Sequence, residues 1–440
     1  MKKIILLVAA LYLSLPVAFA QDSNKFSVTV YGFVRNYLNY DSRKTYTVVG
    51  GEYNMFPYDE NRVDVGGPDL NDVSSLQFQA LTSRLGVAVT GPKLLGWNTS
   101  GKIEADFGGF GTTNTVLRLR LAYVNLERWS AGGNRHGSLL IGQDWHPLSG
   151  DIMPDVLGMA AGAPFRPHSR TPQIRATQYW GPFGCSAALL WQLQYMNNGP
   201  EDPTSLASVA SIDFANHALW PEAFLGFNFK QGGWYAQLGV DAQILRPRIY
   251  GYKYASSPTI YEVDETVKSL TPTLYAQYVG NGLSVKFRTM MAQNTSHLNQ
   301  LVGYGITGVK TDGSYSYAPL NASISYLNIA CGTKVRANLF LGYMKNLGAN
   351  ENLFVFGYTG YRIFMKGGYN FTHLNSAYRV APSISYNLPH FNFGIEYEWT
   401  ACTFGDLSSN GSIKLNDNLH QVDNHRVCVM VKYNFGAQVK

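Results

Sequence analysis

The sequence predicts an all-β fold, a transmembrane antiparallel β-barrel of about sixteen strands. Three features point to it: a secretory signal at the N-terminus, alternation of apolar and polar residues along the rest of the chain, and connections that are alternately short and long. Alternation is the period of a β-strand whose two faces meet different surroundings. We expect a single barrel domain over residues 21–440.

The first twenty residues have the three parts of a secretory signal peptide. Two lysines precede an apolar stretch over residues 4–17, and the run Ala18-Phe19-Ala20 forms a small-residue cleavage site. This stretch is shorter than the about 20 residues that a spanning helix requires. We expect residues 1–20 to be removed, and the loss of the two lysines lowers the formal net charge from +6 to +4.

The alternation is regular enough to place each strand. In one segment Val285 and Phe287 alternate with Ser284, Lys286 and Arg288. The sixteen predicted strands are residues 25–40, 73–90, 99–108, 115–129, 137–146, 171–181, 184–196, 222–231, 233–246, 268–280, 282–294, 317–330, 332–346, 376–387, 390–403 and 419–435. An even number of strands is typical of single-chain bacterial outer-membrane barrels.

The connections indicate a membrane barrel rather than a soluble β-sandwich. Short turns follow every second strand, and nearly all the intervening connections are long, which is the polarity of a transmembrane barrel. Backbone polar groups in hydrocarbon must be paired within the protein, so the sheet has to close on itself. Tryptophans near strand ends suit an interfacial girdle, and they are Trp129, Trp180, Trp191, Trp234 and Trp399. We therefore expect the chain in the outer membrane of a Gram-negative bacterium.

Strand phase assigns the charged side chains to the lumen, because a charge at the middle of the lipid face costs roughly 2–4 kcal/mol. The basic wall residues are Arg35, Arg84, Lys102, Arg118, Arg120, Arg175, Lys230, Lys286, Arg288, Lys334, Arg336, Arg426 and Lys432. The acidic residues opposing them are Glu104, Asp106, Asp241, Glu396 and Glu398. A surplus of arginine and lysine favours anions in a channel. A near-neutral pore limited by size stays open as an alternative, since Glu104 and Asp106 could pair with the arginines of the next strand.

The third long connection, residues 147–170, carries Arg166, His168 and Arg170 near its return. Around it lie short runs in a fixed order: Tyr31-Gly32-Phe33, Ser83-Arg84-Leu85-Gly86, Glu104-Ala105-Asp106-Phe107, Leu117-Arg118-Leu119-Arg120 with Ala122-Tyr123, Gly142-Gln143-Asp144-Trp145, and Arg170-Thr171-Pro172-Gln173-Ile174-Arg175. In these pieces, mainly within residues 28–180, the chain resembles the DcaP-type family of outer-membrane porins.

The resemblance implies a trimeric sixteen-stranded porin whose third loop folds inward and narrows the pore. It implies passive diffusion of small hydrophilic solutes, with a preference for organic anions such as carboxylates. The residues expected at the constriction are Arg84, Arg118, Arg120, Arg166, His168, Arg170 and Arg175. The partners expected are these solutes, outer-membrane lipid and lipopolysaccharide, the barrel-assembly machinery and two further copies of the chain.

Other classes of function have weaker support in the sequence. The side-chain types of a catalytic site occur together in Asp144, His146, Ser149 and Asp151. Those of a calcium or zinc site occur in Asp144, His146, Asp151 and Asp155. We nevertheless expect no enzyme, no cofactor and no metal. An adhesin or structural barrel acting through its surface loops is the main alternative. The basic residues are dispersed at strand period, so nucleic-acid binding is not expected. The histidines in predicted loops or at strand ends are expected to be solvated, and they are His217, His297, His373 and His420. A disulfide such as Cys402–Cys428 is left open.

Overall fold

The computed structural model describes residues 26–109, 116–149, 152–158, 162–202, 207–252, 259–356, 361–407, 413 and 417–439. The signal peptide expected over residues 1–20 lies outside these ranges. The described part of the chain contains no helix that is long and apolar enough to cross a membrane.

Sixteen strands among the described residues form one closed antiparallel ring. In order around the barrel they are β1 (Ser27–Asp41), β5 (Arg84–Leu94), β6 (Trp97–Gly109), β7 (Val116–Trp129), β8 (Arg135–Trp145), β9 (Arg170–Trp180), β10 (Phe183–Leu190), β13 (Glu222–Gln231), β14 (Trp234–Leu245), β17 (Val267–Gly280), β18 (Leu283–Gln293), β20 (Tyr315–Gly332), β21 (Val335–Ala349), β23 (Leu374–Asn387), β24 (Phe391–Asp406) and β25 (Asp417–Val439). The ring closes because β25 pairs with β1, from Val28 opposite Val439 to Asp41 opposite Arg426. The predicted sixteen-stranded barrel is confirmed, and each predicted strand overlaps one of these.

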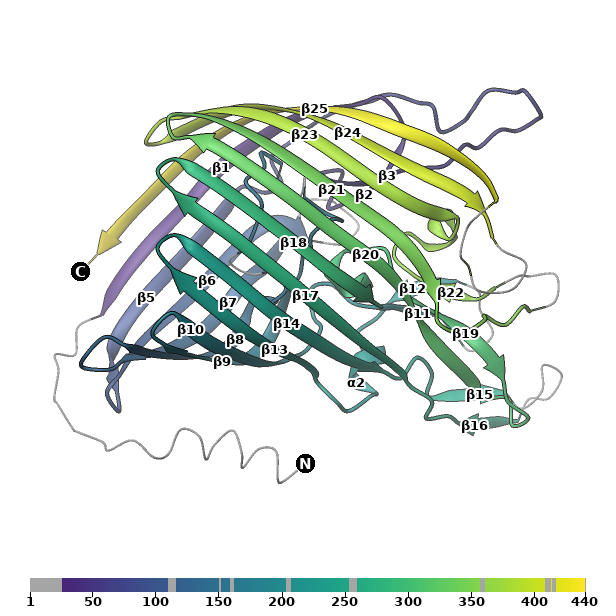
Figure 1. The fold of residues 1–440 in the computed structure, drawn as a ribbon, viewed down its shortest axis with the longest axis horizontal. Coiled ribbons are helices and arrows are strands. Elements are labelled where there is room, and N and C mark those ends of the chain that lie inside the picture. The colour runs from purple at the N-terminus through teal and green to yellow at the C-terminus, as the bar shows by residue number, and fades with distance from the viewer. Residues whose placement is uncertain are drawn as a thin grey trace.

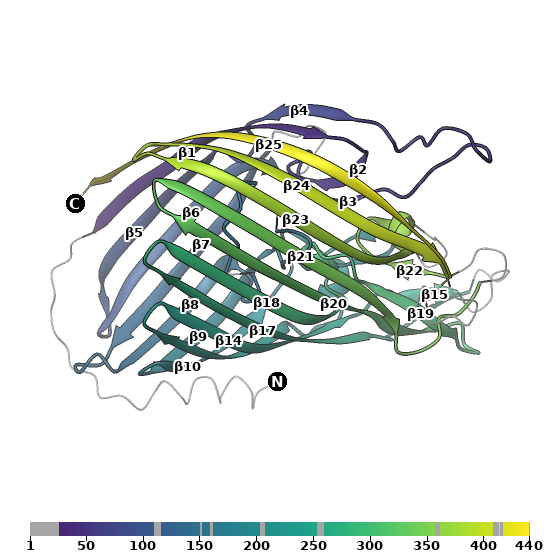
Figure 2. The ribbon, with the colours of Figure 1, turned by 45° about the horizontal axis from the view of Figure 1, so that its top comes forward.

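The connections differ at the two ends of the barrel. Tight turns such as Asn281-Gly282 join the strands at the end where the C-terminus lies, and the long connections gather at the opposite end with β15 and β19 (Figure 1). Asn281 and Gly282 both have positive φ, a conformation that suits a two-residue hairpin turn. The strands tilt in the same sense around the wall (Figure 2). This is the polarity that the sequence predicts.

The wall has an apolar outer face and a polar inner face, as β6 and β7 illustrate. Ile103 and Leu117 are more than half exposed on the outside, where lipid would cover them. Asp106 and Arg120, which point inward, are at most 1% exposed. Period-two alternation therefore separates the lipid face from the lumen along both strands.

Shorter elements lie within the long connections. They are β2 (Thr45–Val48), β3 (Tyr53–Pro57), β4 (Ser75–Gln79), β11 (Asn198–Pro200), β12 (Ser208–Ala210), α2 (Asp213–Asn216), β15 (Tyr250–Tyr252), β16 (Ile260–Glu262), η1 (Ser296–Leu298), β19 (Tyr304–Val309), β22 (Ile363–Phe364) and η3 (Gly368–Phe371). We call residues 42–74 the first loop, 146–169 the third, 191–221 the fourth, 294–314 the sixth and 350–373 the seventh.

The third loop folds inward and is anchored to the far wall. The hydroxyl of Tyr326 on β20 donates to the carbonyl of Ile152 at 2.9 Å. Asp155 forms ion pairs with Lys286 and Arg336, each at 3.2 Å. Charge-assisted hydrogen bonds of this kind are stronger than neutral ones, so they fix the path of the loop across the lumen. The inward-folded third loop is confirmed.

The β2–β3 hairpin of the first loop also enters the barrel. Tyr53 and Phe56 of β3 are fully buried, and the Phe56 ring lies 6.2 Å from the ring of Phe165 in the third loop. Phe165 in turn packs against Phe340 of β21, with ring centroids 6.4 Å apart. Aromatic packing therefore joins the first loop, the third loop and the barrel wall into one interior core.

Candidate functional site

The basic residues of β7 form ion pairs with the acidic residues of β6. Arg118 forms two hydrogen bonds to Asp106, from Nε at 2.6 Å and from Nη2 at 3.1 Å. Arg120 reaches Glu104 at 2.8 Å through Nε and Asp106 at 2.6 Å through Nη1. The two strands are neighbours, so the carboxylates lie beside the arginines and not across the lumen from them. The expected opposing arrangement is therefore corrected for Glu104 and Asp106.

The return of the third loop brings a further set of basic side chains to the same place. Arg170, the first residue of β9, is fully buried, and its guanidinium lies 4.6 Å from the ring centroid of Trp145. Its Nε donates to Gln194 Oε1 at 2.6 Å. Its Nη1 and Nη2 have no hydrogen-bond partner among the described residues, and Arg170 forms no ion pair there. Buried guanidinium donors without an acceptor are rare, because leaving them unpaired is costly.

His168 lies between the first and third loops as a neutral side chain. Its Nε2 is 2.9 Å from the hydroxyl of Tyr53, and the Trp145 ring meets its imidazole edge-on at 5.0 Å. Burial lowers the pKa of His168 well below its usual value, and the charges of Arg166 and Arg170 lower it further. Burial also raises the pKa of Tyr53 to about 12, so this contact is uncharged.

The side chains around Arg118 and Arg170 carry more positive than negative charge. Glu104 and Asp106 together balance Arg118 and Arg120, and Arg84 also reaches Glu104 at 3.3 Å. The remaining cations come from the loops. Arg166 is buried in the third loop, and half-buried Lys366 of the seventh loop lies 5.7 Å from the ring centroid of Tyr195. Burial lowers the pKa of Lys366. We call Arg118, Arg120, Arg166, His168, Arg170 and Lys366 the basic cluster.

Arg175 lies outside the basic cluster. It is also on β9, but its Nη2 pairs with Asp144 Oδ2 at 2.7 Å, and its side chain is 22% exposed. The resemblance places Arg175 with Arg118 and Arg120 on the basic side of the constriction. The structure puts it in a separate ion pair.

The other acidic residues expected on the opposing wall of the lumen occupy two separate places. Glu398 on β24 accepts from Asn54 Nδ2 of the first loop at 2.6 Å and pairs with Arg379 at 3.3 Å. Glu396, on the same strand, accepts from the backbone N–H of Leu157 in the third loop at 3.1 Å. Both carboxylates therefore hold inward-folded loops against the wall.

Asp241 lies elsewhere, on β14, 3.8 Å from His146 at the start of the third loop. Glu222 and His297 complete this second group, and both are buried. The expectation that His297 is solvated is wrong, because the sixth loop carries it into the barrel, where it is 1% exposed. The other histidines expected to be solvated are partly exposed (His217 and His373) or exposed (His420). All four cysteines are free.

Sequence reasoning missed several residues of these sites. Tyr53 and Lys366 belong to loops, where no period reveals which side chains point inward. Gln194 and Tyr195 fall within the predicted strand 184–196, but β10 ends at Leu190, so strand alternation does not assign their faces. Glu222 is the first residue of its strand, so alternation does not assign its face. Arg379 lies in a predicted strand, but apolar neighbours such as Val380 obscure the alternation there.

Comparison with solved structures relates the fold to known outer-membrane proteins. The chain is similar to the outer-membrane channel DcaP of Acinetobacter baumannii, with 16% identity over 96% of this chain and 100% of that one and a TM-score of 0.61. It also matches an anion-selective porin from Comamonas acidovorans (14% identity, 93% and 100% coverage, TM-score 0.49) and OmpT of Vibrio cholerae (11% identity, 95% and 100% coverage, TM-score 0.49). No protein-family model matches the chain, and no curated protein sequence matches it. The expected likeness to DcaP-type porins and the outer-membrane location are confirmed; at these identities the likeness is one of fold.

The expectation that the chain is not an enzyme is corrected. The comparisons show a likeness of fold alone, so they do not exclude catalysis. Among the residues considered for catalysis, His146 Nε2 faces Glu222 at 2.7 Å, whereas Ser149 Oγ accepts from the backbone N–H of Ser169 at 3.2 Å. Asp151 lies outside the described residues.

Proposed function

We propose that the chain is an outer-membrane porin that lets small hydrophilic solutes diffuse passively and prefers organic anions such as carboxylates. The closed barrel with its polar lumen and inward-folded loops supports a pore. The basic cluster supports the preference, because arginine and lysine side chains in a constriction favour anions. The low-dielectric wall strengthens the field at this point.

The observation that carries the preference is the state of Arg170. Its Nη1 and Nη2 are buried and lack a hydrogen-bond partner among the described residues, while Arg118 and Arg120 are already paired with carboxylates. A guanidinium presents two parallel N–H donors that match the two oxygens of a carboxylate. A carboxylate solute at this point would therefore supply the acceptors that the described residues do not.

Because Arg170 is buried, a solute can reach its guanidinium only if the loops that cover it move. Arg170 is fully buried, and its Nε is held by Gln194 of the fourth loop, beside Tyr195 and the β2–β3 hairpin. A solute that contacts Arg170 must displace part of this cover. We infer that the hairpin and the start of the fourth loop move during passage, on the nanosecond-to-microsecond timescale that is typical of loops.

The assembly partners are proposals that come from the resemblance to DcaP-type porins. These are a homotrimer, contact of the outer face with lipid and lipopolysaccharide, and insertion by the barrel-assembly machinery. The exposed apolar outer face, with Ile103 and Leu117 as examples, is compatible with lipid or with another copy of the chain.

Swelling of proteoliposomes tests the proposed function. We expect a small dicarboxylate to enter faster than a neutral sugar of similar size and a diamine. Arg170→Gln should slow the dicarboxylate several-fold and leave the sugar unchanged, whereas Arg135→Gln, an exposed arginine at the turn end, should change neither. Failure of every solute to enter would contradict the pore, and equal rates for all three, unaffected by Arg170→Gln, would contradict the anion preference.

A further inference from the structure

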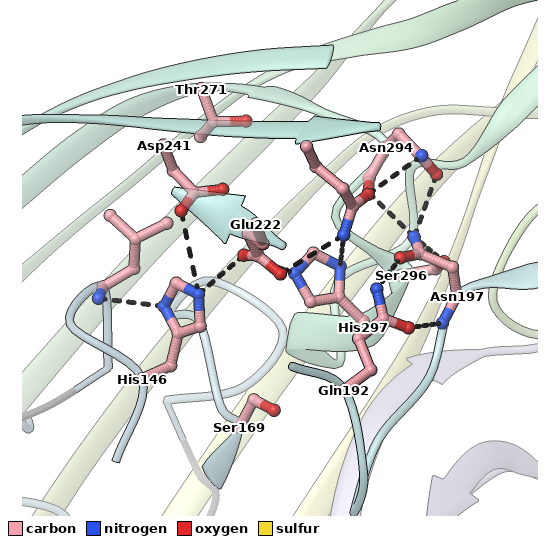
Figure 3. A network of polar contacts seen from close by, with 12 residues as sticks. His146, Ser169, Gln192, Asn197, Glu222, Asp241, Thr271, Asn294, Ser296 and His297 are labelled. Atoms are coloured by element: carbon pink, nitrogen blue, oxygen red, sulfur yellow. Dashed lines mark hydrogen bonds and ion pairs between the residues drawn. The ribbon is translucent and has the colours of Figure 1, made fainter. Parts of the chain in front are cut away.

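Four buried side chains converge where the third and sixth loops meet the wall. His146 follows β8, His297 lies in η1, Glu222 begins β13 and Asp241 lies on β14 (Figure 3). Glu222 Oε1 is 2.7 Å from His146 Nε2 and 3.1 Å from His297 Nε2. The ligand atoms of these three residues all lie within 4.8 Å of one another. Strands and loops far apart in sequence therefore aim two imidazoles and a carboxylate at one point.

The fourth side chain has a buried oxygen without a hydrogen-bond partner in the part of the chain that the structure describes. Asp241 Oδ1 lies 3.8 Å from His146 Nε2, is buried, and has no hydrogen-bond partner among the described residues. Asp241 and Glu222 are 4% and 5% exposed. Two neighbouring carboxylates in such a place repel each other unless a cation or a proton lies between them. This is an observation independent of the His–Glu–His geometry, and it points to the same centre.

We propose that His146, Glu222, His297 and Asp241 bind one divalent metal ion of the zinc class. Two imidazole nitrogens and two carboxylate oxygens make a four-coordinate set that suits Zn²⁺, and two carboxylates balance its charge. The ion ties the start of the third loop and η1 of the sixth loop to β13 and β14. This inference does not depend on the proposed function, because it concerns how the loops are held and not which solute passes.

The surroundings supply an outer shell and an access path. Gln243 Nε2 donates to Glu222 Oε2 at 3.4 Å. Outer-shell hydrogen bonds of this kind orient metal ligands. Glu222 and Gln243 also line a cavity of about 360 Å³ whose other walls include the exposed rings of Trp191 and Trp220. An ion can therefore approach Glu222 through this cavity.

One contact changes when the metal binds. The backbone N–H of Leu148 donates to His146 Nδ1 at 3.1 Å, which places the imidazole proton on Nε2. Coordination through Nε2 moves that proton to Nδ1, where it faces the Leu148 N–H, so this hydrogen bond opens. The backbone at the start of the third loop should therefore respond to the metal, and the Leu148 amide should exchange faster in its presence.

Metal titration of the full-length protein, folded in detergent and freed of metal by a chelator, tests the proposal. We expect calorimetry with Zn²⁺ alone to give one ion per chain, and Co²⁺ to show the intense visible absorption of a four- or five-coordinate site. His297→Ala and Glu222→Gln should weaken Zn²⁺ binding by more than about tenfold, the scale known for disturbed metal sites. His420→Ala is the matched control, because it removes an exposed histidine paired with Asp59 at 2.6 Å, and it should leave binding unchanged.

Three results would overturn the proposal. Wild-type protein that binds no Zn²⁺ stoichiometrically contradicts it without any variant. Wild-type affinity in folded Glu222→Gln also contradicts it, and this variant keeps the shape of the side chain if His297→Ala fails to fold. An octahedral Co²⁺ spectrum, or binding lost equally in His420→Ala, would assign the ion to a surface site.

Discussion

At the scale of single residues, the lumen contains two kinds of charged group. Some pair with a carboxylate of the wall, and others have buried donors without an acceptor among the described residues. Arg118 and Arg120 belong to the first kind, because Asp106 and Glu104 neutralise them at 2.6 to 2.8 Å. Arg170 belongs to the second. The surplus positive charge therefore comes from the loop return rather than from the wall arginines that alternation reveals.

The pairing of Arg118 with Asp106 predicts a stability effect. Arg118→Gln leaves the Asp106 carboxylate buried without its main partner, and breaking a buried ion pair from one side typically costs about 3–5 kcal/mol. We expect the double variant Arg118→Gln with Asp106→Asn to recover much of this loss. Urea unfolding in detergent measures the free energy of unfolding of each variant. Additive effects of the two substitutions would contradict the pairing.

The buried carboxyl group of Glu52 should make the stability of the β2–β3 hairpin depend on pH. This residue of the first loop is buried, and burial raises the pKa of its carboxyl group to about 7. Because the folded pKa lies above the ordinary value, the hairpin is most stable at low pH and loses stability as the pH rises through about 7. We expect proteolysis within the first loop to be faster at about pH 8 than at about pH 6.

Glu52→Gln should remove this difference, since an amide does not ionise. Glu60→Gln is the control, because Glu60 is exposed in the same loop and pairs with Arg62 at 2.8 Å. The same pH dependence in wild type and in Glu52→Gln would assign it to another group.

At the scale of elements, the β2–β3 hairpin is the main obstruction that the first loop contributes. Arg379 Nη2 donates to the carbonyls of Asn54 and Met55 at 2.9 and 3.0 Å, and Asn54 bonds to Glu398. These contacts bring the hairpin across the lumen to the basic cluster, where Tyr53 meets His168.

Replacing residues 45–57 with a short Gly-Ser linker should raise the single-channel conductance, because the buried side chains of β3 leave the lumen. The barrel should stay folded, since Arg379 and Glu398 still pair with each other at 3.3 Å. Shortening the β15–β16 hairpin is the control and should leave the conductance nearly unchanged. An unaltered conductance after removal of β2 and β3 would show that the ion path bypasses the first loop.

The strands could be predicted from sequence, and the loops could not, for a physical reason. Lipid on one side and a polar lumen on the other impose period two on every strand, so Arg118 and Arg120 could be placed inward from sequence alone. A loop that folds back into the lumen has no such constraint. The sequence therefore does not predict His297, Lys366 or Tyr53 at the sites. It indicates Arg166, His168 and Arg170 only because they lie at the return of the third loop.

At the scale of the whole molecule, the barrel fold and the interior loops have different roles. The closed ring from β1 to β25 satisfies the backbone in lipid, and the loops that fold inward determine what the lumen contains. Two of the buried polar groups are the basic cluster near β7 and β9, and the His146–Glu222–His297 group near β13. The first bears on which solutes pass, and the second on how the loops are held.

The reversal potential of the purified protein in a planar bilayer under a potassium chloride gradient tests the central claim most directly. We expect stable single-channel steps with an anion-signed potential in the wild type, and a potential closer to zero in the double variant Arg166→Gln with Arg170→Gln. A zero or cation-signed potential in the wild type would contradict the claim that the basic cluster sets selectivity.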